Sequence, residues 1–325
     1  MQYDSQPPRR HLGGDVLQIG MPMLAVAFIF LFSTLLQSVV ILLVSSFAPH
    51  LADADWYVWT VSMVPMYAVA MPLSLLLYRP SRSEPPPKRS MPFPIWLGTL
   101  SLCFALTYVG NWVGILVNTV IGILTGEPPV NDLANLTVES PLWANLLFGG
   151  ILAPIMEEVF YRKMMIDRLR RYGDLPAILL SGVIFGLIHG NFSQFFYAAL
   201  SGIVLGYVYL KTGKLRYTVG LHMAINLVGS VYSVEMLKKL DLDLLASDPL
   251  NALLLDFGGI AMYTSYMVFV AAVLISAPFA VFFLRKYIHL RKASDPLTAS
   301  QWIRVLVLNP GAWILALVIA LLFVL

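Results

Sequence analysis

The sequence predicts an all-α protein, a polytopic bundle of about eight to nine transmembrane helices. Of its 325 residues, 58% are hydrophobic and 12% are charged, and the mean hydropathy is +0.77. Soluble globular proteins carry about 25% charged residues, so this chain has too little polar surface for a water-soluble globule of its size. The apolar residues gather into long runs, and the loops between them alternate in charge. No separate soluble domain is evident.

The apolar runs set the number of spans, because a helix crosses a bilayer with about 20 residues. The run at 176–190 is too short to cross without a locally thinned bilayer. The last run contains NPG at 309–311, which predicts a kink or a partly interfacial segment. The runs that we expect to be helical lie at 20–47, 56–78, 93–124, 142–166, 176–190, 193–210, 217–235, 258–284 and 303–325.

Loop charges predict the orientation, because Lys and Arg are enriched in cytoplasmic loops. Every second loop is basic, and the loops between are acidic or neutral. The N-terminal segment, with Arg9 and Arg10, falls on the basic side, so we expect a cytoplasmic N-terminus. Its polar character does not predict a cleaved signal peptide, and we expect the plasma membrane. The basic loops lie at 79–92, 168–171, 211–216 and 285–292.

Composition also bears on partners. The basic residues occupy short loops between apolar runs, so membrane lipid is the expected surrounding and no nucleic acid is expected as a partner. The one cysteine, Cys103, cannot form an internal disulfide and lacks metal-ligand spacing. We interpret it as a small core residue.

The chain divides into three regions, of which the central one carries unexpected polar groups. Residues 1–141 hold three spans, and residues 236–325 hold one or two. Residues 142–235 contain three short polar motifs within apolar runs. A charge within the bilayer costs about 2.5–3.5 kcal/mol on insertion scales and is kept when it is paired or lines a wet cavity. These motifs therefore mark the candidate site.

The first motif is EEVFYR, which puts Glu157, Glu158 and Arg162 into an apolar helix. Residues four apart share a helix face, so we expect Glu158 and Arg162 to form an ion pair. Glu157 is turned by about 100° from Glu158 and is expected to face a cavity. The alternative is a position at the cytoplasmic interface, which explains Arg162 better than Glu157.

The other two motifs supply two imidazoles and a carboxamide. FGLIH puts Phe185 and His189 on one helix face, and the break that follows at HGN indicates a cavity. HMAIN puts His222 and Asn226 one turn apart. The alternatives are a structural histidine and an interhelical asparagine.

Helical rise brings these groups to similar depths. Counted from the nearest basic loop at about 1.5 Å per residue, Glu157 and His222 lie at about 9–10 Å and Asn226 at about 15 Å. His189 lies at about 20 Å on the same scale. We therefore expect one wet pocket, open toward the cytoplasmic half. A buried Glu beside a His suits a general base, and His and Asn donors suit an oxyanion, so the set is suited to amide hydrolysis.

The three motifs resemble those of the CPBP family. This family includes CAAX prenyl endopeptidases of the Ras-converting type, bacteriocin-processing and immunity (Abi) proteins, and lysostaphin-resistance-like proteins. EEVFYR matches EExxxR, FGLIH matches FxxxH and HMAIN matches HxxxN, in the family's order. The resemblance covers about 142–235 and leaves the flanking spans unmatched.

The resemblance implies an intramembrane endopeptidase. It assigns water activation to Glu157 with His189, and oxyanion stabilisation to His222 and Asn226. It assigns Glu158 and Arg162 a structural ion pair, with Phe185 as a supporting residue. Family members have been described both as metalloproteases and as metal-independent glutamate proteases. No HExxH zinc motif is present, so no obligatory metal is expected. If a divalent metal such as zinc is bound, its expected ligands are Glu157, His189 and His222.

The expected substrate is a peptide or a membrane-associated protein, cut near the cytoplasmic face. Two other classes can use the same polar cluster. A membrane transporter would show repeat symmetry and a second gated opening, and no repeat is apparent. A non-catalytic immunity or scaffold protein would not need the full motif set. The sequence gives no indication of the oligomeric state.

Overall fold

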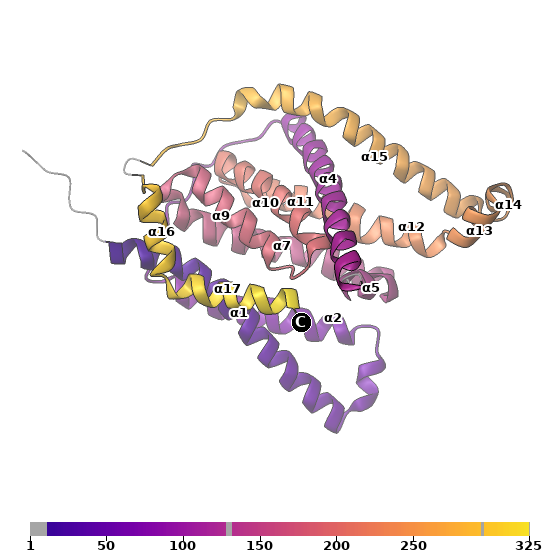
Figure 1. The fold of residues 1–325 in the computed structure, drawn as a ribbon, viewed down its shortest axis with the longest axis horizontal. Helices are drawn as coiled ribbons and strands as arrows, with labels where there is room; N and C mark the ends of the chain where they lie inside the picture. The colour runs from indigo at the N-terminus through magenta and orange to yellow at the C-terminus, as the bar shows by residue number, and fades with distance from the viewer. Residues whose placement is uncertain (1–11, 128–131, 294–295, 325) are drawn as a thin grey trace, which may run out of the picture.

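The computed structural model describes residues 12–127, 132–293 and 296–324, and these residues form helices and loops with no β-strand (Figure 1). The predicted all-α helix bundle is confirmed. Within the described residues, six helices are long and apolar enough to cross a membrane, or up to seven if the bent pair α16 and α17 counts as one span. The six are Leu12–Phe47, Tyr57–Tyr78, Phe93–Thr125, Leu142–Tyr172, Phe192–Thr212 and Phe257–Tyr287.

The span count is lower than the eight to nine expected. Helix α9 (Asp174–Leu187) has 14 residues, too few to cross a bilayer alone. The helix at 215–239 is not among the six, because charged and polar residues interrupt its apolar run. Helices α16 (Ala299–Val307) and α17 (Pro310–Val324) meet at a bend of 73°, at the NPG sequence where a kink was predicted.

Several of the long helices change their winding along their length. The helix at 57–78 runs through α2 (Tyr57–Met63), a π-helical turn and α3 (Met71–Ser74). The helix at 142–172 runs through α6 (Leu142–Ala144), a π-helical segment (Asn145–Leu152), α7 (Ala153–Glu157), a second π-helical segment (Glu158–Ile166) and α8 (Asp167–Leu169). The helix at 215–239 joins α11 (Leu215–Asn226) to α12 (Ser233–Lys239) through another π-helical turn.

The helices that carry the motifs lie in the middle of the bundle. Helix α10 (Phe192–Thr212) packs between α9 and α4 (Phe93–Thr125), α15 (Phe257–Leu284) packs on α4, and α17 packs on α1 (Leu12–Phe47). Close approach depends on small residues: a Cβ on Gly110 of α4 would lie 2.5 Å from the Tyr197 backbone of α10. The short helices α5 (Asp132–Glu139), α13 (Leu242–Ser247) and α14 (Pro249–Leu255) lie toward the right of Figure 1.

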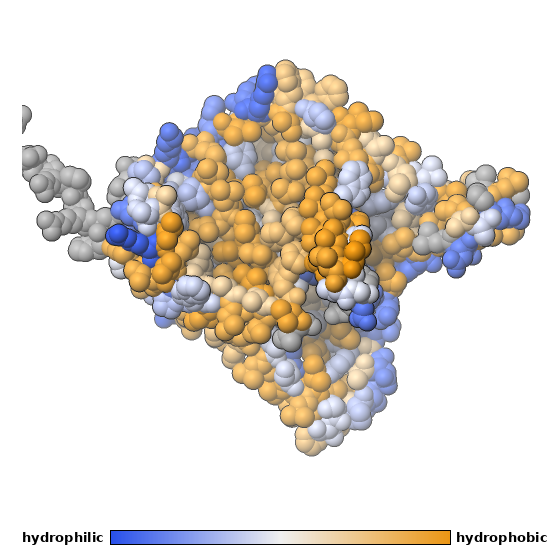
Figure 2. Space-filling view, in the orientation of Figure 1, coloured by the Kyte–Doolittle hydropathy of each residue, from blue (hydrophilic) through white to orange (hydrophobic). Residues whose placement is uncertain are grey.

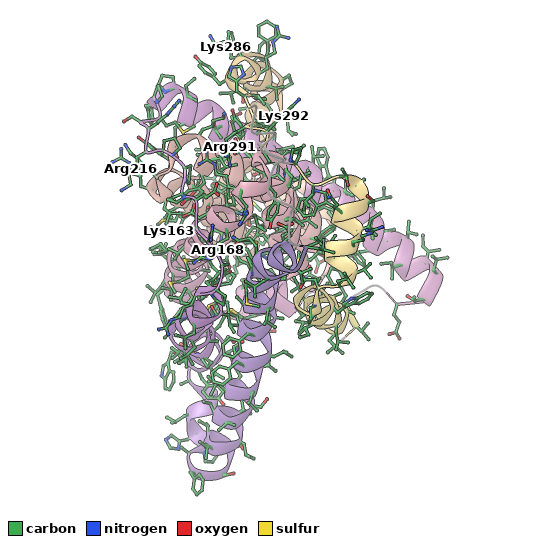
Figure 3. All side chains as sticks on the ribbon, turned by 90° about the vertical axis from the view of Figure 1, so that its left-hand side faces the viewer. Lys163, Arg168, Arg216, Lys286, Arg291 and Lys292 are labelled. Carbon is green, nitrogen blue, oxygen red and sulfur yellow. The ribbon has the colours of Figure 1, made fainter. Side chains whose placement is uncertain are left out.

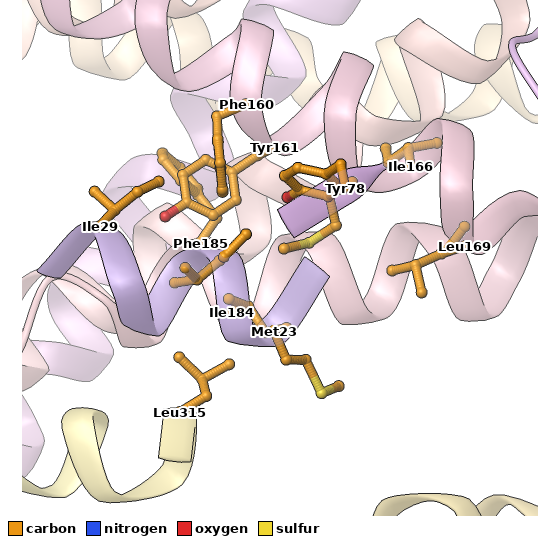
Figure 4. Packing of buried hydrophobic residues seen from close by; sticks show 14 of the residues in the cluster. Met23, Ile29, Tyr78, Phe160, Tyr161, Ile166, Leu169, Ile184, Phe185 and Leu315 are labelled. Carbon is orange, nitrogen blue, oxygen red and sulfur yellow. The ribbon is translucent and has the colours of Figure 1, made fainter. Parts of the chain in front are cut away.

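One hydrophobic cluster joins all three regions of the chain. It contains residues of α1, the 57–78 helix, the 142–172 helix, α9, α10 and the C-terminal helices. Figure 4 shows Met23, Ile29, Tyr78, Phe160 and Leu315 packing together in this cluster. The face of the bundle seen in Figure 2 is largely hydrophobic in its middle, and hydrophilic residues gather toward its margins. This distribution suits a protein surrounded by lipid.

The basic loops meet at one end of the molecule, here called the basic end. Main-chain hydrogen bonds join Glu84 to Asp167, Arg89 to Thr212, and Asp174 to Arg291. These bonds tie together the four basic loops at 79–92, 168–171, 211–216 and 285–292. Figure 3 looks onto this end, where Arg216, Arg291 and Lys292 are labelled. The four basic loops thus lie on the same side of the bundle, as their alternation along the chain predicted.

Candidate active site

The EEVFYR sequence lies at a change of helical winding. Glu157 ends α7, and Glu158 begins the π-helical segment that follows. A π-helical turn widens the helix, and such turns occur frequently at functional sites. Glu158 and Arg162 still face one another, whereas Glu157 turns toward a cavity.

Glu158 and Arg162 form a fully buried ion pair. Arg162 Nε donates to Glu158 Oε2 at 3.0 Å, and both side chains are 0% exposed. Arg162 Nη1 also donates to Ser181 Oγ at 3.0 Å, and the guanidinium lies over the Phe185 ring, 5.1 Å from its centroid. A buried charge is tolerated only when it is paired and hydrogen-bonded. These contacts, here called the ion-pair layer, therefore hold the helix at 142–172 against α9.

His222 lies between the two glutamates. Its Nδ1 is 3.1 Å from Glu158 Oε1, and its Nε2 is 3.6 Å from Glu157 Oε2. The first distance is a hydrogen bond and the second is an ion-pair contact longer than a hydrogen bond. When Nδ1–H donates to Glu158, Nε2 carries a hydrogen only in the protonated imidazolium. Glu158 thereby orients the imidazole so that Nε2 faces Glu157 and the cavity.

Glu157 is the exposed member of the pair. Its side chain is 15% exposed and lines the cavity. Tyr67, from the π-helical turn of the 57–78 helix, donates its hydroxyl to Glu157 Oε1 at 2.9 Å. Glu157 thus has one oxygen held by Tyr67 and the other near His222.

His189 and Asn226 line the same cavity from two other helices. His189 Nδ1 is 2.8 Å from Phe185 O, an arrangement in which Nδ1–H donates and Nε2 keeps a free lone pair. Asn226 Nδ2 donates to Gly149 O at 3.0 Å, which leaves a second N–H. In the described residues, no hydrogen bond joins His189 to Glu157 or Asn226 to His222. The four motif side chains meet around one space without forming a closed network.

Gly190 and Asn191 shape the turn that follows His189. Gly190 has φ of +68°, which favours glycine. Asn191 donates from Nδ2 to His189 O, and its Oδ1 accepts from Gln194 N, so it caps α10. A Cβ on Gly190 would lie 2.8 Å from Leu322 O, because the end of α17 rests against this turn.

The cavity has a volume of about 160 Å³. The sequence predicted a pocket open toward the cytoplasmic half, where the basic loops lie. The lining residues lie on the parts of their helices that are remote from the four basic loops, and the side to which the pocket opens stays a prediction. The cavity is lined by Trp59, Met63, Tyr67, Thr137, Asn145, Gly149, Ala153, Glu157, Phe185, His189, Gln194, Tyr197, Ala198, Ser201, His222, Ile225, Asn226 and Ser230.

Helix α5 lies across the end of the cavity that is remote from the basic loops. Trp59 Nε1 donates to Ser140 Oγ at 2.7 Å, and Asn145 Nδ2 donates to Thr137 O at 2.7 Å. Lys238 Nζ donates to Ser140 O at 2.6 Å. The segment 137–140 is thereby fixed to three different helices at this end of the cavity.

Sequence reasoning missed two residues that contact the motif side chains. Tyr67 and Ser181 lie in apolar runs without a motif of their own, and each bonds to a motif residue that is distant in sequence. The only available signal was a hydroxyl within a predicted span, which many structural residues share. Contacts of this kind depend on which helices become neighbours, and helix periodicity does not encode that.

Within the described residues, no group of three or more His, Cys, Asp or Glu side chains is arranged to hold a metal ion. His222 Nδ1 and His189 Nδ1 are engaged by Glu158 and Phe185 O, respectively. The possible ligands Glu157, His189 and His222 line one cavity but do not form a ligand set in this arrangement.

Comparison with known proteins finds similarity in the central region of the chain. Residues 139–228, which contain all three motifs, match the family model "Type II CAAX prenyl endopeptidase Rce1-like". The chain is 25% identical over 111 residues to "Putative membrane peptidase YdiL" of Bacillus subtilis (strain 168), a match that covers 34% of this chain and 46% of that protein. It is 27% identical over 137 residues to "UPF0177 protein YxdF" of Lactococcus lactis subsp. lactis (strain IL1403), covering 41% of this chain and 73% of that protein. No solved structure matches the chain.

Proposed function

We propose that the protein is an intramembrane endopeptidase, because residues 139–228 match the family model "Type II CAAX prenyl endopeptidase Rce1-like". The supporting observation is the shared cavity of Glu157, His189, His222 and Asn226. The whole protein is proposed to be a multi-pass protein of the plasma membrane with its N-terminus in the cytoplasm. Its substrate is a peptide or a membrane-associated protein.

The proposed reaction begins with a water held between Glu157 and His189. Glu157 accepts a proton from this water, and the oxygen attacks the carbonyl carbon of the substrate peptide bond. The lone pair on His189 Nε2 orients the water, since its Nδ1 is bonded to Phe185 O. As the C–N bond of the intermediate breaks, Glu157 delivers the proton to the leaving amine nitrogen, so its carboxylate is regenerated.

The tetrahedral intermediate carries a negative oxygen that needs donors. His222 Nε2–H and the second N–H of Asn226 are the donors proposed for it. His222 can donate from Nε2 while Nδ1 is bonded to Glu158, provided that the imidazole is protonated. The Arg162 guanidinium pairs with Glu158 and orients it for this contact.

The test is a cleavage assay on purified protein with Glu157→Gln. General-base catalysis contributes about a hundred- to ten-thousandfold to the rate, so we expect at least a hundredfold loss with unchanged thermal stability. Glu235→Gln, which changes a partly exposed glutamate paired with Lys238, is the matched control. Equal cleavage by wild type and Glu157→Gln excludes the proposal.

We further propose that the reaction needs no obligatory metal, as the sequence predicted, because the ligand candidates lack a metal-binding arrangement. Cleavage should persist after dialysis against a strong chelator. A loss of activity that zinc restores would contradict this part of the proposal and leave the endopeptidase assignment intact.

A further inference from the structure

A second pocket lies at the basic end, apart from the cavity that holds the motif residues. Its volume is about 290 Å³, and none of its lining residues lines the motif cavity. Each of the four basic loops contributes one positively charged side chain to its walls, and these are Arg89, Arg170, Lys211 and Arg291. Figure 3 looks onto this end of the molecule and labels Arg291. We call this feature the basic pocket.

The basic pocket carries an excess of positive charge. Among the described residues that line it, Asp174 is the one acid. This carboxylate is buried and already held, because Arg170 Nε lies 3.3 Å from Oδ1 and the Arg291 main-chain N–H donates to Oδ2 at 2.8 Å. The Arg291 guanidinium also lies 3.8 Å from Asp174. The other two basic side chains of the pocket have no acidic partner within the described residues.

These two side chains, Arg89 and Lys211, keep hydrogen-bond donors that no described protein group uses. The main-chain N–H of Arg89 donates to Thr212 O at 2.7 Å, which fixes the loop. Its guanidinium makes no hydrogen bond or ion pair with a described residue. Lys211 Nζ donates to the main-chain oxygen of His289, which leaves two of its three N–H donors. Free guanidinium and ammonium donors in one pocket suit an anion, and the planar guanidinium matches the geometry of phosphate oxygens.

The wall formed by residues 287–291 is fixed to two helices. The Tyr207 hydroxyl of α10 donates to Tyr287 O. The main-chain N–H of Asp174, at the start of α9, donates to Arg291 O at 2.9 Å. The basic pocket is therefore a built feature of the fold, and its positive charges are held around one space.

Exposed apolar side chains continue from the basic pocket along the end of α15. Leu290 lines the pocket and is exposed, and Phe283, Tyr287 and Ile288 before it are exposed as well. A free phosphate ion makes no use of such a surface, whereas the acyl chains of a lipid cover it. Basic pockets between transmembrane helices on the cytoplasmic side bind anionic lipid head groups. The neighbouring apolar surface therefore favours a phospholipid over a soluble phosphate.

We propose that the basic pocket binds the phosphodiester head group of an anionic phospholipid. Arg89 and Lys211 donate to the phosphate oxygens, while Arg170 and Arg291 hold Asp174 and add positive charge. In the orientation proposed above, the basic end faces the cytoplasmic leaflet, which carries anionic lipids. The site is separate from the candidate active site, and it does not depend on the proposed peptidase activity.

The test measures lipid binding by the full-length protein in a neutral detergent. Phosphatidylglycerol is added in mixed micelles, and its affinity is taken from the rise in unfolding temperature, because a ligand that binds the folded state stabilises it. Phosphatidylcholine, which has a phosphodiester but no net charge, is the lipid control. The pocket variant is Arg89→Gln with Lys211→Gln. The matched variant is Lys163→Gln with Arg216→Gln, which removes the same charge from side chains of the basic end that do not line the pocket.

We expect the pocket variant to bind phosphatidylglycerol about thirtyfold more weakly than wild type, or roughly fivefold for each basic side chain removed. The matched variant should stay within about twofold of wild type, because its basic pocket is intact. Equal weakening in both variants would show that overall charge attracts the lipid and would overturn the proposal, as would equal affinity for phosphatidylcholine. Inorganic phosphate that stabilises the protein as well as the lipid does would overturn the lipid assignment. If the pocket variant does not fold, Arg89→Gln alone decides, with a fivefold loss expected and no loss contradicting the proposal.

Discussion

At the scale of single residues, Glu157 and Glu158 are neighbours in sequence with opposite surroundings. Glu158 is fully buried and bonded to both Arg162 and His222. Glu157 is partly exposed and held by the Tyr67 hydroxyl. The division follows from the angle of about 100° between successive helical residues, which sends one carboxylate into the ion-pair layer and the other into the cavity.

Tyr67→Phe tests whether the hydroxyl positions Glu157. Hydrogen bonds to charged groups contribute about 1.5–3 kcal/mol, so we expect the rate of cleavage to fall about ten- to a hundredfold, with little change in substrate affinity. The measurement is kcat against KM. Tyr197→Phe is the matched control, since Tyr197 lines the cavity and its hydroxyl makes no hydrogen bond within the described residues. Equal losses in both variants would contradict a specific role for Tyr67.

Arg162→Met tests the buried ion pair. Removing one partner leaves Glu158 as an uncompensated buried charge, which typically costs about 3–5 kcal/mol. We expect a clear fall in the unfolding temperature in detergent, followed by loss of cleavage. The double variant Glu158→Gln with Arg162→Met should recover part of that stability, because no unpaired charge remains. A double variant less stable than Arg162→Met would contradict this account.

At the scale of elements, the predictable contacts were those within one helix. The i, i+4 spacing predicted the Glu158–Arg162 pairing because both residues lie on one helical face. The bridge from His222 to both glutamates joins residues 64 and 65 positions apart, and no local pattern encodes it. Counting depth in residues also placed the motifs at one level, but it did not reveal that Glu158 is fully buried between Arg162 and His222. That burial depends on side-chain packing between helices.

Gly190→Ala tests how α17 supports the turn that carries His189. The substitution imposes a side chain on a left-handed backbone, at a cost of about 1–2 kcal/mol, and brings the new Cβ against Leu322 O. Displacement of a catalytic group by about 1 Å can cost a hundredfold in rate, so we expect cleavage to fall about ten- to a hundredfold. Gly126→Ala is the control, since Gly126 also has positive φ but no described atom within 4 Å of a Cβ. Similar activity of both variants would exclude a role for the α17 contact.

At the scale of the whole molecule, the matched segment depends on helices outside it. Residues 139–228 contain the motifs, but α10 packs against α4, and Glu157 is held by Tyr67. The sequence indicated a central region at 142–235 because the polar motifs lie there. It could not show that this region lacks a separate core, since the packing partners have ordinary apolar sequences. One hydrophobic cluster runs through all three regions.

Splitting the chain between its third and fourth membrane helices tests this dependence. Residues 1–127 and 132–325 are produced separately and together. Transmembrane helices associate through close packing and interhelical hydrogen bonds, and the Gly110–Tyr197 approach and the Tyr67–Glu157 bond both cross the cut. We therefore expect the two fragments to copurify and cleave substrate, and 132–325 alone to lose at least the tenfold that removal of the Tyr67 hydrogen bond predicts. Full activity of 132–325 alone would show that the N-terminal helices are dispensable, and would require another partner for Glu157.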